Sequence, residues 1–144
     1  MNDLAKHHSS VDDVLELGIA MWSEGRFQDH CFDMDYIRRF IEHTMDNGFV
    51  MVLPSIGFFM GGLGPFWFDP TKTQAFDYAW YVKPEYRSKT YGVRLLKGFI
   101  AWAQVKGCKE VVISPQVEID NGGCERLLQG MGFKPLGRNM VIAL

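Results

Sequence analysis

The chain has 144 residues, which is enough for one domain with a hydrophobic core and too short for two domains of ordinary size. Its hydrophobic content of 47% and aromatic content of 14% are typical of a globular protein and exclude a disordered chain. The net charge of −2 argues against a broad nucleic-acid-binding surface, because such surfaces are usually basic.

The sequence also indicates where the protein works. No run approaches the roughly 20 apolar residues that a membrane span needs, and the first residues lack the pattern of a signal peptide. The three cysteines, Cys31, Cys108 and Cys124, are odd in number and form no close pair, which is typical of reduced thiols. We therefore expect a cytoplasmic protein without a membrane or nucleic-acid partner.

The first element expected is a helix over residues 11–24. Its apolar residues recur on one helical face, Ser10 precedes them, and Asp13 stands where a capping box places an acid. Gly25 is expected to end the helix. Residues 4–8 have only a weak strand pattern, so a first strand at this end is poorly marked.

A second helix should follow a short loop. Asp33 or Asp35 is suited to cap its start, an apolar stripe runs along it, and Gly48 closes it. The loop before it contains His30 and Cys31, but no second pair of ligands lies at a familiar metal-binding spacing. No metal site is expected there.

Two strands of an antiparallel pair come next. Residues 49–53 are a continuous apolar run, residues 54–57 have turn composition, and residues 58–63 read as the returning strand. The glycines within 61–64 are not a nucleotide-binding loop, because no helix with a Lys-Ser/Thr pair follows them. They predict a bulge or a close backbone approach.

Residues 65–70 are expected to form an aromatic loop bracketed by prolines. Its Phe66-Trp67-Phe68 run fits either core or partner packing, or one wall of an acceptor pocket. The next strand, residues 75–82, is rich in aromatic and β-branched residues and is ended by Pro84, which lacks the N–H that a ladder needs.

The stretch from Val82 to Leu96 joins this strand to a helix that is expected to reach about Lys106. The connecting loop carries Arg87 and Lys89 and ends at Gly92. A helix start has unpaired N–H groups and is locally positive, so this loop is suited to bind an anion such as a pyrophosphate.

This stretch resembles the acetyl-CoA site of the GNAT N-acetyltransferases. The family's signature is Arg/Gln-x-x-Gly-x-Gly/Ala, and Arg87 and Gly92 match its two ends, while Thr90 replaces the middle glycine. The Thr90 hydroxyl could donate a hydrogen bond to the phosphate in place of the closer backbone approach that glycine allows.

A second resemblance lies beyond a strand expected at residues 110–114. The family's distal motif is Asn-x-x-Ala-x-x-Leu-Tyr-x-x-x-Gly-Phe, and the chain matches it with Asn121 and with Gly132-Phe133. Leu128 occupies the position of the tyrosine that is the family's frequent general acid, so the usual acid is missing. Closing strands are expected within residues 133–136 and 139–144.

The resemblance implies the fold and the reaction. The fold is a single α/β (α+β) domain over residues 1–144, with a mixed, mostly antiparallel sheet, about four flanking helices, and a parallel pair splayed at the cofactor site. The reaction is direct transfer of an acetyl group from acetyl-CoA to an amine of a small molecule or a protein, without a metal. A homodimer is left open.

The resemblance also implies the cofactor-binding residues. Backbone amides from Arg87 to Val93 would hold the pyrophosphate, the backbone of Tyr81 and Val82 would pair with the pantetheine arm, and Asn121 would bind that arm or the reacting region. The full expected set is Tyr81, Val82, Arg87, Ser88, Lys89, Thr90, Tyr91, Gly92, Val93 and Asn121.

For the catalytic residues we expect Asp77 as the base, together with Asn121. A carboxylate among aromatic neighbours has a raised pKa, which suits proton removal near neutral pH; the alternative is a solvated or paired strand carboxylate. A replacement acid could come from a set of tyrosines that the sequence does not rank: Tyr78, Tyr81, Tyr86 and Tyr91. Alternatively, the thiolate leaves unassisted.

Two other functions stay open. Thr90 and Leu128 also fit a catalytically weak module that binds acyl-CoA for regulation. The aromatic residues 66–68 also fit a structural or assembly protein of the same fold. The acceptor cannot be inferred from the sequence.

Overall fold

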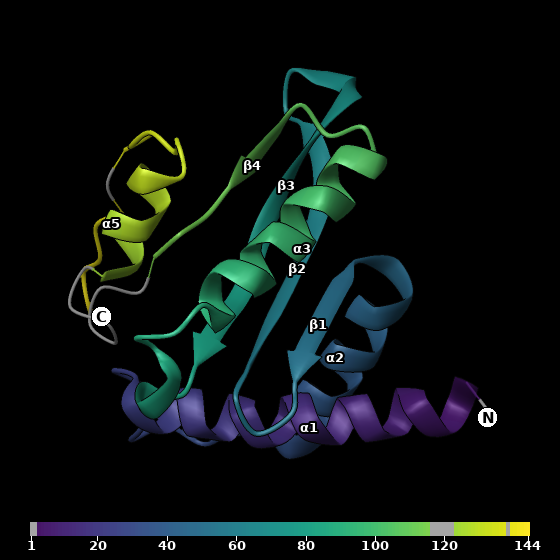
Figure 1. The fold of residues 1–144 in the computed structure, drawn as a ribbon, viewed down its shortest axis with the longest axis vertical. Helices are drawn as coiled ribbons and strands as arrows, with labels where there is room; N and C mark the ends of the chain where they lie inside the picture. The colour runs from purple at the N-terminus through teal and green to yellow at the C-terminus, as the bar shows by residue number, and fades with distance from the viewer. Residues whose placement is uncertain (1–2, 116–122, 138) are drawn as a thin grey trace. The chain divides into compact units, whose positions relative to one another are not determined.

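A computed structural model describes residues 3–115, 123–137 and 139–144 (Figure 1). The chain divides into two compact units, Met1–Ser114 and Pro115–Leu144, and each is described by itself. No helix in the described part of the chain is long and apolar enough to cross a membrane.

The first unit is built on a mixed sheet. Its strands are β1 (Phe49–Leu53), β2 (Gly57–Phe66), β3 (Asp69–Val82) and β4 (Glu110–Val112), in the order β1-β2-β3-β4. The first three pair antiparallel, and β4 pairs parallel to β3. The expected fold class, a mostly antiparallel sheet with one parallel pair and flanking helices, is confirmed.

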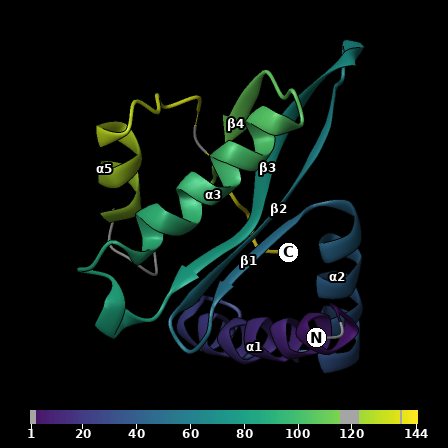
Figure 2. The same cartoon turned by 45° about the vertical axis from the view of Figure 1, so that its right-hand side comes forward.

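Two helices cover one face of this sheet, α1 (Asp3–Glu24) and α2 (Met34–Asn47) (Figures 1 and 2). The core on this face is formed by apolar side chains of α1, α2, β2 and β3: Val11, Val14, Leu15, Leu17, Ile41, Phe58, Met60 and Tyr81. The start of α2 is capped as expected, because Asp33 Oδ1 accepts a hydrogen bond of 3.0 Å from the Tyr36 N–H.

A third helix, α3 (Tyr91–Val105), covers the opposite face (Figure 2). Its Phe99 stacks on Phe59 of β2 with 4.5 Å between the ring centroids, and Leu95 and Leu96 are fully buried. Parallel strands need a crossover connection, and α3 is the helix of the connection between β3 and β4.

The predicted start of the first helix is wrong. The helix begins at Asp3 and not near Val11, so Ser10 lies inside it, and residues 4–8 are helical and not a weak strand. Leu4, Ala5 and Lys6 are good helix formers, and their propensity outweighs the capping signal at Ser10.

The predicted aromatic loop is also wrong. β2 extends to Phe66 and β3 begins at Asp69, so only Trp67 and Phe68 connect the strands. The Asp69 side chain organises this turn, because its Oδ1 accepts hydrogen bonds from the Thr71 N–H at 3.0 Å and from the Thr71 hydroxyl at 2.6 Å. Trp67 and Phe68 are exposed at the tip of the hairpin.

The second unit contains α5 (Gly123–Gly130). As expected, Gly132 ends this helix region with φ of +97°, and the Phe133 N–H donates to the Leu128 carbonyl at 3.0 Å. The predicted closing strands are wrong for the described residues, since 133–137 and 139–144 contain no strand. Strand composition does not form a strand where no neighbour supplies a ladder.

Candidate functional site

The candidate site lies along the last residues of β3, beyond the point where β3 stops pairing with β4. The parallel register runs from Gln74 opposite Glu110 to Phe76 opposite Val112, whereas β2 still pairs with β3 as far as Val82. Among the residues that the structure describes, β3 has no strand partner on its β4 side after Phe76. Such an edge offers backbone groups to an extended ligand.

Asp77 sits where β3 and β4 separate. Its Oδ1 accepts a 3.0 Å hydrogen bond from the Ser114 N–H. β4 ends at Val112, before Ser114, which was the predicted last residue of that strand. Burial raises the pKa of Asp77 above its ordinary value, and the hydrogen bond from Ser114 lowers it by less. The expected direction of this pKa shift is confirmed.

The backbone around Asp77 is irregular. Gly61 of β2 lies opposite Asp77 while Met60 lies opposite Ala79, so Tyr78 is an extra residue in β3. The bulge predicted from the glycines of β2 is therefore present at this point. Tyr78 turns its ring against Phe40 of α2, with 5.2 Å between the ring centroids.

The anion site predicted from the sequence falls at the start of α3. A short 3₁₀ turn, Pro84–Tyr86, follows β3, and α3 begins at Tyr91 with Thr90 as its N-cap. The Thr90 side chain makes no capping hydrogen bond, and the first N–H groups of a helix have no partner within it. Backbone donors and a free Thr90 hydroxyl are therefore available to a phosphate at one place.

Gly92 leaves space at this helix start. A Cβ added at Gly92 would lie 3.6 Å from Trp80 Cζ2 and 3.8 Å from Val82 Cγ2, which are ordinary contact distances. The packing of the first unit therefore does not require a glycine here. A pyrophosphate that lies close to this backbone would require one, so the residues present fit that group.

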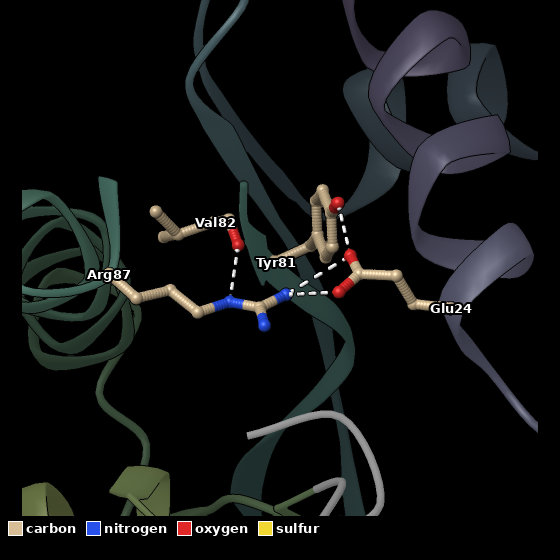
Figure 3. Close-up of polar contacts among 4 residues, drawn as sticks. All are labelled: Glu24, Tyr81, Val82 and Arg87. Carbon is tan, nitrogen blue, oxygen red and sulfur yellow. Dashed lines mark hydrogen bonds and ion pairs between the residues drawn. The ribbon is translucent and has the colours of Figure 1, made fainter. Parts of the chain in front are cut away.

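Arg87 does not have the solvent-facing side chain that a basic phosphate loop would suggest. Its Nε donates to the Val82 carbonyl at 2.8 Å, and its Nη2 donates to both Glu24 carboxylate oxygens at 3.0 and 3.1 Å (Figure 3). Lys89 and Arg94 are exposed, and neither forms an ion pair with any described residue. Both residues lie within the sequence that surrounds the start of α3, at Tyr91.

Glu24 is a residue that the sequence did not reveal as part of this region. It is the last residue of α1, and it accepts hydrogen bonds from Arg87 and from the Tyr81 hydroxyl (Figure 3). The contact spans 63 positions along the chain, so no local pattern signals it.

The four candidate tyrosines differ in their surroundings. Burial and the hydrogen bond to Glu24 raise the pKa of Tyr81 well above its ordinary value, so Tyr81 is poorly suited to release a proton. Tyr86 and Tyr91 contact each other edge to face in the loop, with 5.7 Å between ring centroids. Tyr78, Tyr86 and Tyr91 stay open as acids.

The distal motif is described only in part. Asn121 lies outside the described residues. Leu128 is buried in α5, so the position that carries tyrosine in the resembled motif is apolar and shielded from water. Cys124, in the position of the motif's alanine, is half-buried.

Several solved structures are similar to this chain. An aminoglycoside N-acetyltransferase, AAC(6')-Iy, in complex with CoA is 16% identical with a TM-score of 0.72, and the match covers 95% of this chain and 90% of that chain. A Trypanosoma brucei acetyltransferase is 17% identical with a TM-score of 0.68, and the match covers 94% of each chain.

A second structure of AAC(6')-Iy, in complex with the bisubstrate analogue CoA-S-monomethyl-acetylneamine, is 18% identical with a TM-score of 0.61; the match covers 88% of this chain and 90% of that chain. These likenesses show the fold. No curated protein matches the chain.

The sequence itself decides the family. Residues 12–133 match the acetyltransferase (GNAT) family, a span that includes the β3–α3 loop and the distal motif. This chain belongs to the acetyltransferase (GNAT) family.

Proposed function

We propose that the chain is an N-acetyltransferase that moves an acetyl group from acetyl-CoA directly to a primary amine. In this proposal residues 1–144 act as one acetyl-CoA-binding domain. The amine nitrogen bonds to the acetyl carbon, the thioester C–S bond breaks, and CoA leaves as a thiolate that takes up a proton.

The observation that carries the proposal is the start of α3. Its backbone donors are not capped by Thr90, and Gly92 leaves room that the surrounding side chains do not fill. Together they support binding of the pyrophosphate by amides within residues 87–93, with Thr90 as a hydroxyl donor and Lys89 as a nearby cation. The N–H groups of Arg87 and Lys89 already donate to the Pro84 and Tyr86 carbonyls, so the donors we propose are the other amides of this stretch.

The edge of β3 supports the position of the pantetheine arm. The backbone of Tyr81 and Val82 follows the point where β4 leaves β3, and an extended arm could pair there as an added strand. The Val82 carbonyl already accepts a bond from Arg87, but a carbonyl oxygen has two lone pairs. Asn121 stays a sequence-based prediction for this step.

Asp77 is the proposed base. A carboxylate with a raised pKa holds a proton more readily than an ordinary aspartate, so it can accept the proton that the attacking ammonium must lose. Its only described hydrogen-bond donor from another residue is the Ser114 N–H, which leaves Oδ2 available for that proton.

The proposed reaction can be tested by mixing the chain with acetyl-CoA and a panel of amines. Release of free CoA thiol that depends on the amine would support the proposal. The panel should contain polyamines, amino acids, a lysine peptide and an aminoglycoside, since an aminoglycoside N-acetyltransferase is among the similar structures. If calorimetry shows that CoA binds but no amine causes release of free thiol, the proposed acetyltransferase activity would be contradicted.

Substitution of Asp77 tests its role as a base separately from its structural role. Asp77→Asn keeps an oxygen that can accept from Ser114, so it removes the base but not the hydrogen bond. We expect turnover at neutral pH to fall at least about tenfold, with a smaller loss as the pH rises and deprotonates the amine, and CoA affinity to stay unchanged.

Equal turnover of Asp77→Asn and parent across the pH range would remove Asp77 from the mechanism. Positioning of the two substrates would then be the simplest source of the acceleration.

A binding module of the same fold is the second candidate. The buried Leu128 favours it, because leucine at this position cannot give a proton to the leaving thiolate. This candidate predicts tight acyl-CoA binding and no turnover, whereas a purely structural protein would not bind acyl-CoA at all.

A further inference from the structure

Three elements of the first unit meet around one carboxylate (Figure 3). Glu24 ends α1, Tyr81 lies near the end of β3, and Arg87 is the first residue of the proposed pyrophosphate loop. Glu24 accepts hydrogen bonds from the Tyr81 hydroxyl and from Arg87 Nη2. The guanidinium also lies against the Tyr81 ring, 5.6 Å from its centroid.

This cluster is more shielded from water than an ordinary surface ion pair. The side chains of Arg87 and Glu24 are 27% and 28% exposed, compared with 40% and 66% for Arg38 and Asp12, another ion pair that α1 makes. Shielded pairs with several hydrogen bonds hold their geometry more firmly than exposed pairs.

The geometry fixes Arg87 at both ends of its guanidinium. Nε is held by the Val82 carbonyl and Nη2 by the Glu24 carboxylate. The Arg87 backbone is part of the turn that leads to α3, since its N–H donates to the Pro84 carbonyl at 3.3 Å. The Arg87 side chain therefore connects this turn to α1, a helix whose Val11, Val14 and Leu17 side chains are buried in the core.

The charge of Arg87 is consequently engaged by the Glu24 carboxylate. A guanidinium that is held by a carboxylate is a poor partner for a phosphate, but it can keep the following backbone in place. The N–H groups of Tyr91, Gly92 and Val93, in the first turn of α3, are the donors for the proposed anion site, whereas the Lys89 N–H already donates to the Tyr86 carbonyl at 3.2 Å. A shift of about 1 Å in the position of such donors weakens an interaction strongly.

We propose that Glu24 is a positioning residue that acts through Arg87 to hold the loop of residues 87–93 in the conformation that binds the acetyl-CoA pyrophosphate. This inference rests on the proposed function of that loop. It assigns Arg87 a role through its side chain that differs from direct contact with the phosphate. Tyr81 completes the cluster by donating to the same carboxylate.

The test compares two isosteric substitutions on one helix. Glu24→Gln removes the charge from the cluster, and Asp12→Asn removes the charge from the exposed pair with Arg38. We expect Glu24→Gln to raise the Kd for CoA about tenfold and to raise the KM for acetyl-CoA similarly, with kcat at saturation unchanged. Asp12→Asn should leave both within about twofold.

The route through Arg87 is tested by a double-mutant cycle. If Glu24 acts through Arg87, the double variant Glu24→Gln with Arg87→Gln should bind CoA as weakly as Arg87→Gln alone. Additive losses would overturn the proposed route. Tighter binding by Glu24→Gln would also overturn it, because Arg87 would then be a phosphate ligand that Glu24 restrains.

Three further outcomes are distinguishable. If Glu24→Gln does not fold, Arg87→Lys serves instead, because a lysine keeps the charge but cannot bridge Val82 and Glu24; it should still raise the Kd for CoA several-fold, and parental affinity would overturn the inference. Parental affinity of a folded Glu24→Gln overturns the positioning role alone. A parent chain that does not bind CoA overturns both the positioning role and the proposed function.

Discussion

The middle of β2 and the start of α3 both contain glycine, but for different reasons. A Cβ at Gly61 would lie 2.6 Å from Phe99 Cε1 and 2.8 Å from the Phe76 carbonyl oxygen, so the fold itself excludes a side chain there. A Cβ at Gly92 would meet nothing closer than 3.6 Å. The fold therefore requires glycine at position 61, whereas packing does not require it at position 92, where a ligand close to the backbone would.

The backbone polar groups around Gly61 and around Gly92 also differ, in whether the fold supplies them with hydrogen-bond partners. Around Gly61 the backbone belongs to continuous pairing between β2 and β3, interrupted only by the bulge. At Gly92 the N–H groups belong to the first turn of a helix, where neither the helix nor the Thr90 side chain supplies an acceptor. Substitutions at Gly61 and Gly92 test this difference.

The largest effect is expected for Gly61→Ala. The added methyl group would press on the Phe99 ring and on the backbone of β3, and overpacking of this kind costs about 1–3 kcal/mol of unfolding free energy. Urea unfolding would measure the loss. The variant that still folds should bind CoA with parental affinity, and unchanged stability would contradict the idea that this glycine is required by packing.

A smaller effect of opposite sign on stability is expected for Gly92→Ala. Alanine fits the space beside Trp80 and reduces the entropy of the unfolded chain, so the unfolding free energy should rise by about 0.4–1 kcal/mol without ligand. CoA affinity should fall at the same time, because the methyl group occupies space that the pyrophosphate approaches.

Gly92→Val provides the graded comparison for this position, and it should weaken CoA binding more than Gly92→Ala does. Calorimetry gives both affinities, and circular dichroism shows whether each variant is folded. A folded Gly92→Val variant with parental CoA affinity would place the phosphate site elsewhere.

Local patterns predicted the elements whose signals lie within a few residues. The strand over 49–53 was predicted with its observed bounds, because a continuous apolar run lies between Gly48 and Pro54. The connection from β3 to α3 was predicted for a similar reason, since Pro84 and Gly92 mark its limits within one short stretch.

Features that depend on distant neighbours could not be predicted. The Glu24–Arg87 contact joins the end of α1 to a loop far along the chain, and nothing near Glu24 distinguishes it from any other glutamate at a helix end. Residues 139–144 have strand composition, but in the described structure no partner strand pairs with them. Asp77 was predicted as a partly desolvated carboxylate, whereas its bond to Ser114 depends on where β4 stops.

The smallest effect is expected for the stability of Asp77→Asn as a function of pH. Asp77 of β3 lies opposite Gly61 of β2. Burial raises the pKa of Asp77 in the folded chain above the ordinary value of 3.8. Between the ordinary and the raised pKa the folded state binds more protons than the unfolded state, so the unfolding free energy falls as the pH rises through this interval. Above the interval the ionised carboxylate destabilises the fold.

Asparagine is never ionised and can still accept from the Ser114 N–H, so Asp77→Asn should be more stable than the parent at neutral pH. The difference should shrink as the pH falls through the interval and should level off below 3.8, where the parent carboxyl is mostly protonated in both states. Urea unfolding of parent and variant at several pH values measures it, with Asp77→Ala as the control that also loses the Ser114 bond. A stability difference that does not change with pH would mean that burial does not disfavour the charge, and Asp77 would lose the property that qualifies it as a base.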